Sequence, residues 1–310
     1  MLTTSFTLLP RPPFRLDLAV WVLRRRPENA IDRWDGNTYR RVLTGSGGPL
    51  LMEVRQQSGL DAPRLQVELH SQTPWPQMRT EATAALERLL GLRVDLTEFY
   101  EFAIKQPLLG PLARRFVGMK PPRYLSAFEC LTNAIACQQV SLASGIQLLN
   151  RFAHAFGDRL EIEGQSQSAF PRPEDLAGVN EADLRALGFS RQKSVAVLLL
   201  ADQVRLDKLN LNALAKLSDQ HAIERLCELR GIGRWSAEYA LLRGLGRLHV
   251  FPGDDVGARN GLQQWLGLSD RLDYDSAAQA LRRWQPYGGL IYFQMLLDKL
   301  AAQGDVYPNH

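Results

Sequence analysis

The segment from Leu229 to Tyr239, Leu-Arg-Gly-Ile-Gly-Arg-Trp-Ser-Ala-Glu-Tyr, constrains the fold of this chain more than any other. Two glycines around one isoleucine allow a tight turn, because glycine adopts positive φ at no steric cost. The run from Arg234 favours a helix, and the free N–H groups at the start of a helix attract anions. Together with an expected helix over 222–229, the segment predicts two helices joined by a hairpin that holds a phosphate group.

We predict that the backbone of this hairpin grips one DNA phosphate without reading the base sequence. The contacting residues would be Gly231, Gly233, Arg234 and Ser236. A short Gly-x-Gly match is also common in ordinary turns between helices, and spacing alone does not separate the two interpretations.

A pair of carboxylates follows in Pro252-Gly-Asp-Asp255. Since the next residues favour a helix, an aspartate here is an expected N-cap. The start of a helix also stabilises negative charge, which is needed if a carboxylate must face a positively charged sugar while a glycosidic bond breaks. One position can therefore serve both as a cap and as a catalytic group.

Three aromatic residues are candidates for a base-binding pocket. Trp235 and Tyr239 are four residues apart on the expected helix, and Tyr287 lies among the breakers of Trp284-Gln-Pro-Tyr-Gly-Gly289. Aromatic residues at helical spacing commonly belong to a core. Beside a carboxylate, however, their faces can stack on an extruded base and attract a cationic one.

The rest of the chain predicts an α+β fold: a small N-terminal antiparallel sheet with helices, followed by a mostly helical part that carries the helix-hairpin-helix. Residues 64–70 alternate apolar and polar side chains, and 38–43 and 51–57 also resemble strands. Strand patterns stop at the Lys120-Pro-Pro122 break. We expect an N-terminal domain over 1–105, a central helical domain over 123–247, and a second helical subdomain made of 106–122 and 248–310. The active-site cleft would lie between the two helical parts.

Helical patterns fill the remainder. Ser126 and Ser141 are expected N-caps, so that Gln138 and Gln139 lie in the turn between two helices. Glycines at 91 and 157 are expected to end helices. Helices are predicted over 16–26, 77–90, 181–186, 192–206, 222–229, 234–242, 256–265, 276–284 and 290–302.

Composition adds little to these motifs. A formal charge of +4 and a pI near 9.0 fit a polyanionic partner without establishing one. Cys130, Cys137 and Cys227 form no metal-binding spacing, so we expect them reduced and buried, with no zinc or iron–sulfur site. The sequence shows no secretion signal and no long apolar run, so we expect a cytoplasmic protein without membrane contact, nucleoid-associated if bacterial.

Taken together, the hairpin, Val250 to Asp255 and the upstream Ala136-Cys-Gln-Gln-Val-Ser141 resemble the helix-hairpin-helix DNA glycosylases, specifically 3-methyladenine DNA glycosylase II of the AlkA type. The resemblance covers nearly the whole chain. It implies an N-glycosyl hydrolase that binds damaged double-stranded DNA as a monomer, requires no cofactor, and removes alkylated bases such as 3-methyladenine and 7-methylguanine to leave an abasic site.

Matched residue by residue, the resemblance implies that Asp255 is the catalytic carboxylate and that Trp235, Tyr239 and Tyr287 form the pocket. Gln139 occupies the position of the wedge that enters the duplex. A monovalent cation, Na⁺ or K⁺, would be held by the backbone carbonyls of Cys227, Leu229 and Ile232. Two positions differ from the family pattern. The wedge is glutamine at Gln139 here and leucine in the best-known bacterial form, and tryptophan often occupies the position of Tyr287.

The residue at position 235 also bears on the type of reaction. Related glycosylases that cut the DNA backbone form a Schiff base with a lysine at this position, which is Trp235 here, and no lysine occurs between Leu229 and Phe251. Strand cleavage is therefore not expected. The alternatives are an oxidised-base glycosylase with lyase activity, which shares the hairpin and the aspartate, and a non-catalytic protein that binds DNA damage.

Overall fold

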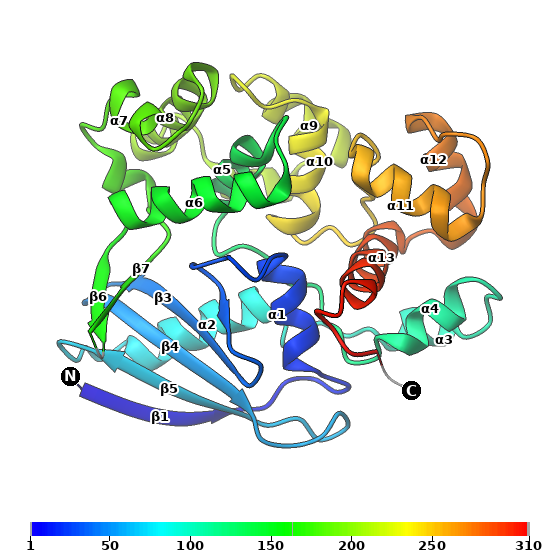
Figure 1. Cartoon of the computed structure of the whole chain (residues 1–310), viewed down its shortest axis with the longest axis horizontal. Coiled ribbons are helices and arrows are strands. Elements are labelled where there is room, and N and C mark those ends of the chain that lie inside the picture. The colour runs from blue at the N-terminus through cyan, green and yellow to red at the C-terminus, as the bar shows by residue number, and fades with distance from the viewer. Residues whose placement is uncertain (1, 163, 309–310) are drawn as a thin grey trace.

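The N-terminal part of the protein is an antiparallel sheet flanked by helices (Figure 1). The computed structural model describes residues 2–162 and 164–308. Strands pair in the order β1-β5-β4-β3-β2, with bounds Leu2–Leu8 for β1, Arg33–Trp34 for β2, Thr38–Gly45 for β3, Gly48–Gln56 for β4 and Leu65–Ser71 for β5. The three predicted strands are confirmed as β3, β4 and β5, whereas the sequence patterns do not indicate β1 and β2.

Strand β5 shows how the apolar alternation builds this domain. Leu65, Val67 and Leu69 are fully buried, while the residues between them are half-buried. The buried face packs against helices α1 (Leu16–Arg24) and α2 (Met78–Leu90). Helix α2 ends at the predicted Gly91, whose φ is 63° and whose N–H donates to the carbonyl of Glu87. The alternation therefore sets which face of the sheet meets the helices.

A second sheet lies where the sequence predicts only helices. Strands β6 (Arg159–Ile162) and β7 (Gln165–Ser168) form a hairpin beyond the Lys120 break, so the expectation that strands end there is wrong. Val42 and Leu51, on the second face of the large sheet, are buried against Leu160 and Ala169. The hairpin covers an apolar patch made by distant residues, a stabilisation that a local pattern does not reveal.

The helical part follows the predicted elements closely. Ser126 and Ser141 accept the backbone N–H groups of Glu129 and Ser144, which confirms both caps. The helices are α3 (Thr97–Ala103), α4 (Leu109–Arg115), α5 (Ala127–Cys137), α6 (Leu142–Phe156), α7 (Glu181–Ala186), α8 (Arg191–Arg205), α9 (Asp219–Cys227), α10 (Arg234–Arg243), α11 (Val256–Leu266), α12 (Tyr274–Leu281) and α13 (Gly288–Ala302). Short 3₁₀ turns occur at Pro173–Leu176, Leu211–Lys216 and Arg282–Trp284. Among these α-helices, α3 and α4 have no counterpart in the sequence predictions.

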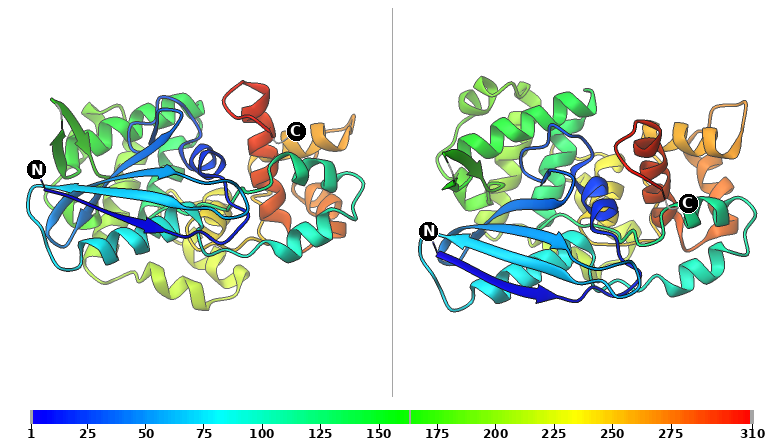
Figure 2. Two further views of the ribbon diagram at one scale, coloured as in Figure 1. Left: turned by 90° about the horizontal axis from the view of Figure 1, so that it is seen from below. Right: turned by 60° about the horizontal axis from the view of Figure 1, so that its bottom comes forward.

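Three main hydrophobic cores organise the chain. The first lies between the sheet, α1 and α2. The second lies around α5 and takes most of its residues from 124–241. The third packs α3 and α4 against residues 242–306. The sheet and the C-terminal helices lie at opposite sides of the molecule (Figure 2). Helix α3, which the predicted boundary at residue 105 places in the N-terminal domain, packs in the third core.

Two of the sequence expectations concern the cysteines and membrane contact. Cys130 is buried, Cys137 is half-buried and Cys227 is exposed, and all three are free thiols, so the predicted burial is wrong for Cys227. That residue ends α9 at the surface. Within the described ranges, no helix is both long and apolar enough to cross a bilayer.

A buried ion cluster joins the sheet to the central helical core. Arg41 of β3 donates to Asp32 Oδ1 at 2.7 Å and to Glu129 Oε1 of α5 at 2.6 Å. Arg41 is fully buried, and the two carboxylates are 2% and 3% exposed. Burial raises the pKa of Glu129, against the lowering effect of Arg41. Because buried charges need their partners, this cluster fixes how the two domains meet.

We expect Arg41→Met to lower the free energy of unfolding by about 3 kcal/mol or more, because two buried carboxylates would lose their cation. Denaturant unfolding measures this loss. The matched control is Arg93→Met, which breaks an exposed pair with Glu87 and should cost less than about 1 kcal/mol. Equal losses for the two variants would contradict a special role for the buried cluster.

Candidate active site at the helix-hairpin-helix

Helices α9 and α10 are joined by the predicted hairpin. Between them, Leu229 N donates to Leu226 O at 3.0 Å and Ile232 N donates to Leu229 O at 3.1 Å. Ile232 is buried and anchors the turn in the core, whereas Gly231 and Gly233 are exposed. The hairpin therefore presents its glycine backbone at the surface.

The two glycines of the turn differ in backbone conformation and in what surrounds them. Gly231 has a φ of 81°, and a Cβ there would lie 2.7 Å from the Cβ of Ala196 on α8, so a side chain would be both strained and obstructed. A Cβ on Gly233 would meet no heavy atom within 4 Å. Gly231 thus permits close packing beneath the hairpin, and Gly233 leaves open space above the start of α10.

The other predicted phosphate-binding residues lie in the first turn of α10. Arg234 is exposed, and its guanidinium carbon lies 4.9 Å from the ring centroid of Tyr274. Ser236 is buried, and its hydroxyl accepts a hydrogen bond from Gln138 Nε2 at 3.0 Å. The Ser236 side chain is therefore committed to the protein, and a phosphate contact there falls to its backbone N–H.

Asp255 caps α11 and at the same time faces α10. Its Oδ1 accepts the N–H of Ala258 at 2.9 Å, and its Oδ2 accepts the indole N–H of Trp235 at 2.8 Å. The two donors and the helix N-terminus stabilise the negative charge. Asp254, by contrast, is exposed, with Arg259 NH1 at 3.7 Å from its Oδ1. The structure thus brings Asp255 directly to the helix that follows the hairpin.

A second carboxylate, absent from the predicted site, supports the loop that carries the aspartates. Glu238 of α10 is 2% exposed. It accepts the N–H of Asp254 at 3.3 Å and the hydroxyl of Tyr274 at 2.8 Å. Burial raises the pKa of Glu238, although both donors oppose that shift. Glu238 therefore ties the Asp254–Asp255 loop to α10 and α12.

Tyr239 belongs to a buried group of aromatic rings stacked with an arginine. Its hydroxyl lies 2.9 Å from that of Tyr124, and its ring centroid lies 5.9 Å from that of Trp235. The fully buried Arg243 places its guanidinium 5.6 Å from the Tyr239 ring and 5.1 Å from the Tyr124 ring. These contacts hold the Tyr239 ring in one orientation.

Tyr292 of α13 is a half-buried aromatic residue on which the charge of Asp255 acts. Burial, and after it the negative charge of Asp255, raises the pKa of Tyr292 above its ordinary value. Its ring meets Phe251 edge-on, with centroids 6.3 Å apart. The negative charge of Asp255 therefore disfavours ionisation of the Tyr292 phenol.

Tyr287 packs among other residues than Trp235 and Tyr239 do. Its ring lies 5.4 Å from that of Phe99 and 5.0 Å from that of Phe102, both on α3. Tyr287 is half-buried at the edge of the third core. Its part in a base pocket stays a prediction.

Gln139 lies in the turn between α5 and α6, as predicted. It is exposed, and its φ of 53° is in the left-handed region that non-glycine residues rarely adopt. Val140 beside it is 47% exposed. The turn therefore projects two side chains into solvent from a constrained backbone.

The predicted cation ligands all belong to the hairpin. Cys227 is the last residue of α9, and the final carbonyls of a helix lack partners within that helix. Leu229 O accepts the Ile232 N–H, which tightens the turn around these carbonyls. Carbonyl oxygens are suitable ligands for Na⁺ or K⁺, so the donor set fits the group that the resemblance implies.

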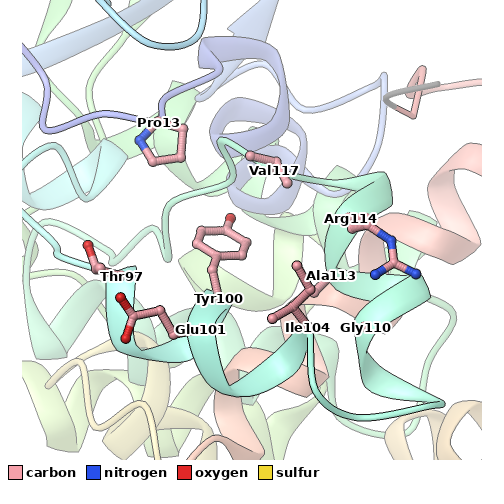
Figure 3. Close-up of a pocket in the computed structure, with 9 residues that line it drawn as sticks. All are labelled: Pro13, Thr97, Tyr100, Glu101, Ile104, Gly110, Ala113, Arg114 and Val117. Atoms are coloured by element: carbon pink, nitrogen blue, oxygen red, sulfur yellow. The ribbon is translucent and has the colours of Figure 1, made fainter.

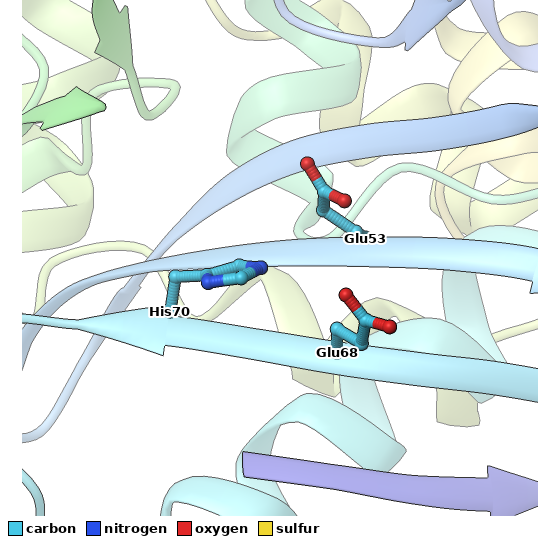
Figure 4. Close-up of side chains that lie close together, drawn as sticks. All are labelled: Glu53, Glu68 and His70. Atoms are coloured by element: carbon cyan, nitrogen blue, oxygen red, sulfur yellow. The ribbon is translucent and has the colours of Figure 1, made fainter. Parts of the chain in front are cut away.

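Two other features of the surface lie apart from the hairpin. A hollow of about 340 Å³ is formed by α3, α4 and Pro13, with Tyr100, Ile104 and Ala113 in its wall (Figure 3). On the sheet, Glu53, Glu68 and His70 gather on β4 and β5 (Figure 4). Arg40 and Arg55 form ion pairs with the two glutamates, which compensates their charge. This cluster is a surface ion-pair network.

The residues that support the site are not among the sequence predictions. Glu238 lies between Trp235 and Tyr239, and Gln138 precedes Gln139, so their place inside the motifs is the signal that marks both. Tyr124 and Tyr292 carry no such signal, because only the packing of distant segments brings Tyr124 to Tyr239 and exposes Tyr292 to the charge of Asp255.

Similarity to known proteins identifies the family of this chain. Residues 132–286 match the family model described as HhH-GPD superfamily base excision DNA repair protein. A DNA-3-methyladenine glycosylase of Bacillus subtilis is 30% identical over 221 residues, which are 70% of this chain and 73% of the relative. The DNA-3-methyladenine glycosylase 2 of Escherichia coli is 27% identical over 283 residues, 91% and 93% of the two chains.

A solved structure shares the whole architecture. The 3-methyladenine DNA glycosylase from Archaeoglobus fulgidus superposes with a TM-score of 0.81 at 25% identity, covering 94% of this chain and 97% of its own. At this coverage the match includes the N-terminal sheet as well as the helical part. This chain belongs to the HhH-GPD superfamily of base excision DNA repair proteins.

Proposed function

We propose that the protein is a monofunctional DNA glycosylase that hydrolyses the N-glycosidic bond of alkylated bases, of the 3-methyladenine and 7-methylguanine type, and leaves an abasic site. The observation that carries the proposal is Asp255, held by the N-terminus of α11 and by Trp235 two residues after the hairpin. The relatives named DNA-3-methyladenine glycosylase support the substrate class.

Binding begins at the hairpin and the wedge turn. The exposed backbone at Gly231 and Gly233 and the first turn of α10 bind a phosphate of damaged double-stranded DNA, and Gln139 enters the gap as the lesion nucleotide rotates out. Flipping costs a few kcal/mol and least for damaged or weakly paired bases. The carbonyls of Cys227, Leu229 and Ile232 would hold Na⁺ or K⁺, whose charge attracts the phosphate. The protein acts as a monomer in this scheme.

The chemistry rests on charge. A base alkylated at N3 or N7 is already cationic, so its departure as a neutral base needs little acid catalysis. Trp235 offers an aromatic face to the base, and the buried Tyr239 packs against Trp235. Asp255 stabilises the positive charge that develops on the sugar and orients the attacking water. Because the hydrogen bonds to Asp255 exist before the substrate arrives, the site needs no reorganisation at the moment of bond cleavage.

Position 235 supports hydrolysis without strand cleavage. A lyase step requires an amine that forms a Schiff base with the sugar. Here an indole occupies that position, and its N–H is engaged by Asp255.

Replacing Asp255 by Asn should reduce single-turnover excision from methylated duplex DNA by at least about 100-fold, because the amide cannot stabilise a cationic sugar. DNA affinity, measured by fluorescence anisotropy, should stay within a few fold. The control is Asp254→Asn, which changes an exposed neighbour and should retain nearly full activity. An active Asp255→Asn protein would refute the assignment.

Borohydride reduction during turnover should trap no covalent protein–DNA adduct. The absence of an amine at position 235 is the reason for this expectation. Gel analysis of the reduced mixture is the measurement, with a known glycosylase/lyase as the positive control. A trapped adduct would favour the oxidised-base glycosylase/lyase alternative.

The substrate range should be broad, since stacking on Trp235 does not depend on one pattern of base hydrogen bonds. Chromatography of the bases released from a panel of duplexes should detect 3-methyladenine, 7-methylguanine and hypoxanthine. Release of 3-methyladenine alone would show that the pocket is selective. Tight binding to every duplex with no release would point to a non-catalytic damage-binding protein.

A further inference from the structure

The turn that carries Gln139 is bonded directly to the hairpin. Gln138 Nε2 donates to the carbonyl of Gly231 at 2.8 Å and to the hydroxyl of Ser236 at 3.0 Å. One amide group thus bridges the wedge turn, the tip of the hairpin and the first turn of α10. The wedge turn is more than 90 residues from the hairpin in the sequence and meets it only in the fold.

Lys193 of α8 holds the same turn from its other side. Its ammonium donates to the carbonyl of Ala136 at 2.9 Å and to the carbonyl of Gln138 at 2.7 Å. These carbonyls lie at the C-terminal end of α5, where helix carbonyls lack helical partners and a cation is favourable. Helix α8 also contacts the hairpin, since the Cβ of Ala196 closes the space beside Gly231.

The backbone just after these anchors is strained. Gln139 has a φ of 53° without being glycine, a conformation that persists only when the surroundings enforce it. The fixed groups next to it are the side chain and the carbonyl of Gln138. Behind the turn, α5 and α6 pack so closely that a Cβ on Gly145 would lie 2.6 Å from Cys137 Sγ.

We propose that Gln138 and Lys193 are positioning residues that lock the Gln139 turn to the phosphate-binding hairpin, so that gripping the backbone and entering the base stack occur as one movement. The inference rests on the proposed glycosylase function. Neither side chain needs to touch the lesion or the reacting atoms. They keep Gln139 at a fixed position relative to the hairpin, and this lowers the free energy needed to flip a paired base.

A comparison of two substrates tests this proposal. Gln138→Leu and Lys193→Met should slow single-turnover excision of a lesion in a stable base pair by about tenfold, the loss expected for one or two hydrogen bonds. The same variants should excise a lesion placed opposite an abasic site within about twofold of the wild-type rate, because that base has no pairing to overcome. A 2-aminopurine beside the paired lesion should brighten on binding wild-type protein and brighten less with the variants.

Controls separate positioning from a general structural defect. Lys193→Arg keeps the cation and its donors and should recover most of the activity on the paired lesion. Lys208→Met, an exposed lysine just beyond α8, should behave as wild type on both substrates. Equal losses on the two substrates, or no loss on either, would overturn the proposal. If the wild-type protein released no base from either substrate, the proposed function would fail instead.

Discussion

Helix α10 is the element on which the rest of the molecule depends, because it is buried on nearly every side. All residues from Ser236 to Arg243 are buried, including Glu238 and Arg243. Charged groups in such a place must be paired or stacked, so each fixes a neighbour. Glu238 holds the Asp254 loop and Arg243 donates to the carbonyl of Val22 on α1. The helix that begins at the hairpin therefore sets the relative positions of the N-terminal domain and both helical cores.

The candidate site lies where these cores meet, so its residues come from both. The central core supplies Trp235 and Tyr239, while Asp255 is the N-cap of α11, a helix that packs in the third core. The hydrogen bond between Trp235 and Asp255 crosses this junction. A carboxylate held in this way is preorganised, because its donors are fixed by packing on both sides before any substrate binds.

The same reasoning applies to the surface that faces DNA in the proposed function. A hairpin and a wedge turn that moved independently would each bind DNA without a defined spacing between phosphate and base step. Gln138 and Lys193 remove that freedom with four hydrogen bonds from two side chains. The left-handed backbone at Gln139 is the local cost of this rigid connection.

The sequence by itself determined the features that depend on near neighbours. Alternation in 64–70 predicted β5 and its buried face, Ser126 and Ser141 marked two helix starts, and Gly231 and Gly233 marked the hairpin, because each signal acts within a few residues. Only the tertiary structure decided the β6–β7 hairpin and the placement of α3 in the third core. The same holds for the Arg41 ion cluster, for the contact of Tyr124 with Tyr239 and for the effect of Asp255 on Tyr292. These arise from contacts between distant segments, where burial of apolar area and pairing of buried charge outweigh local preference.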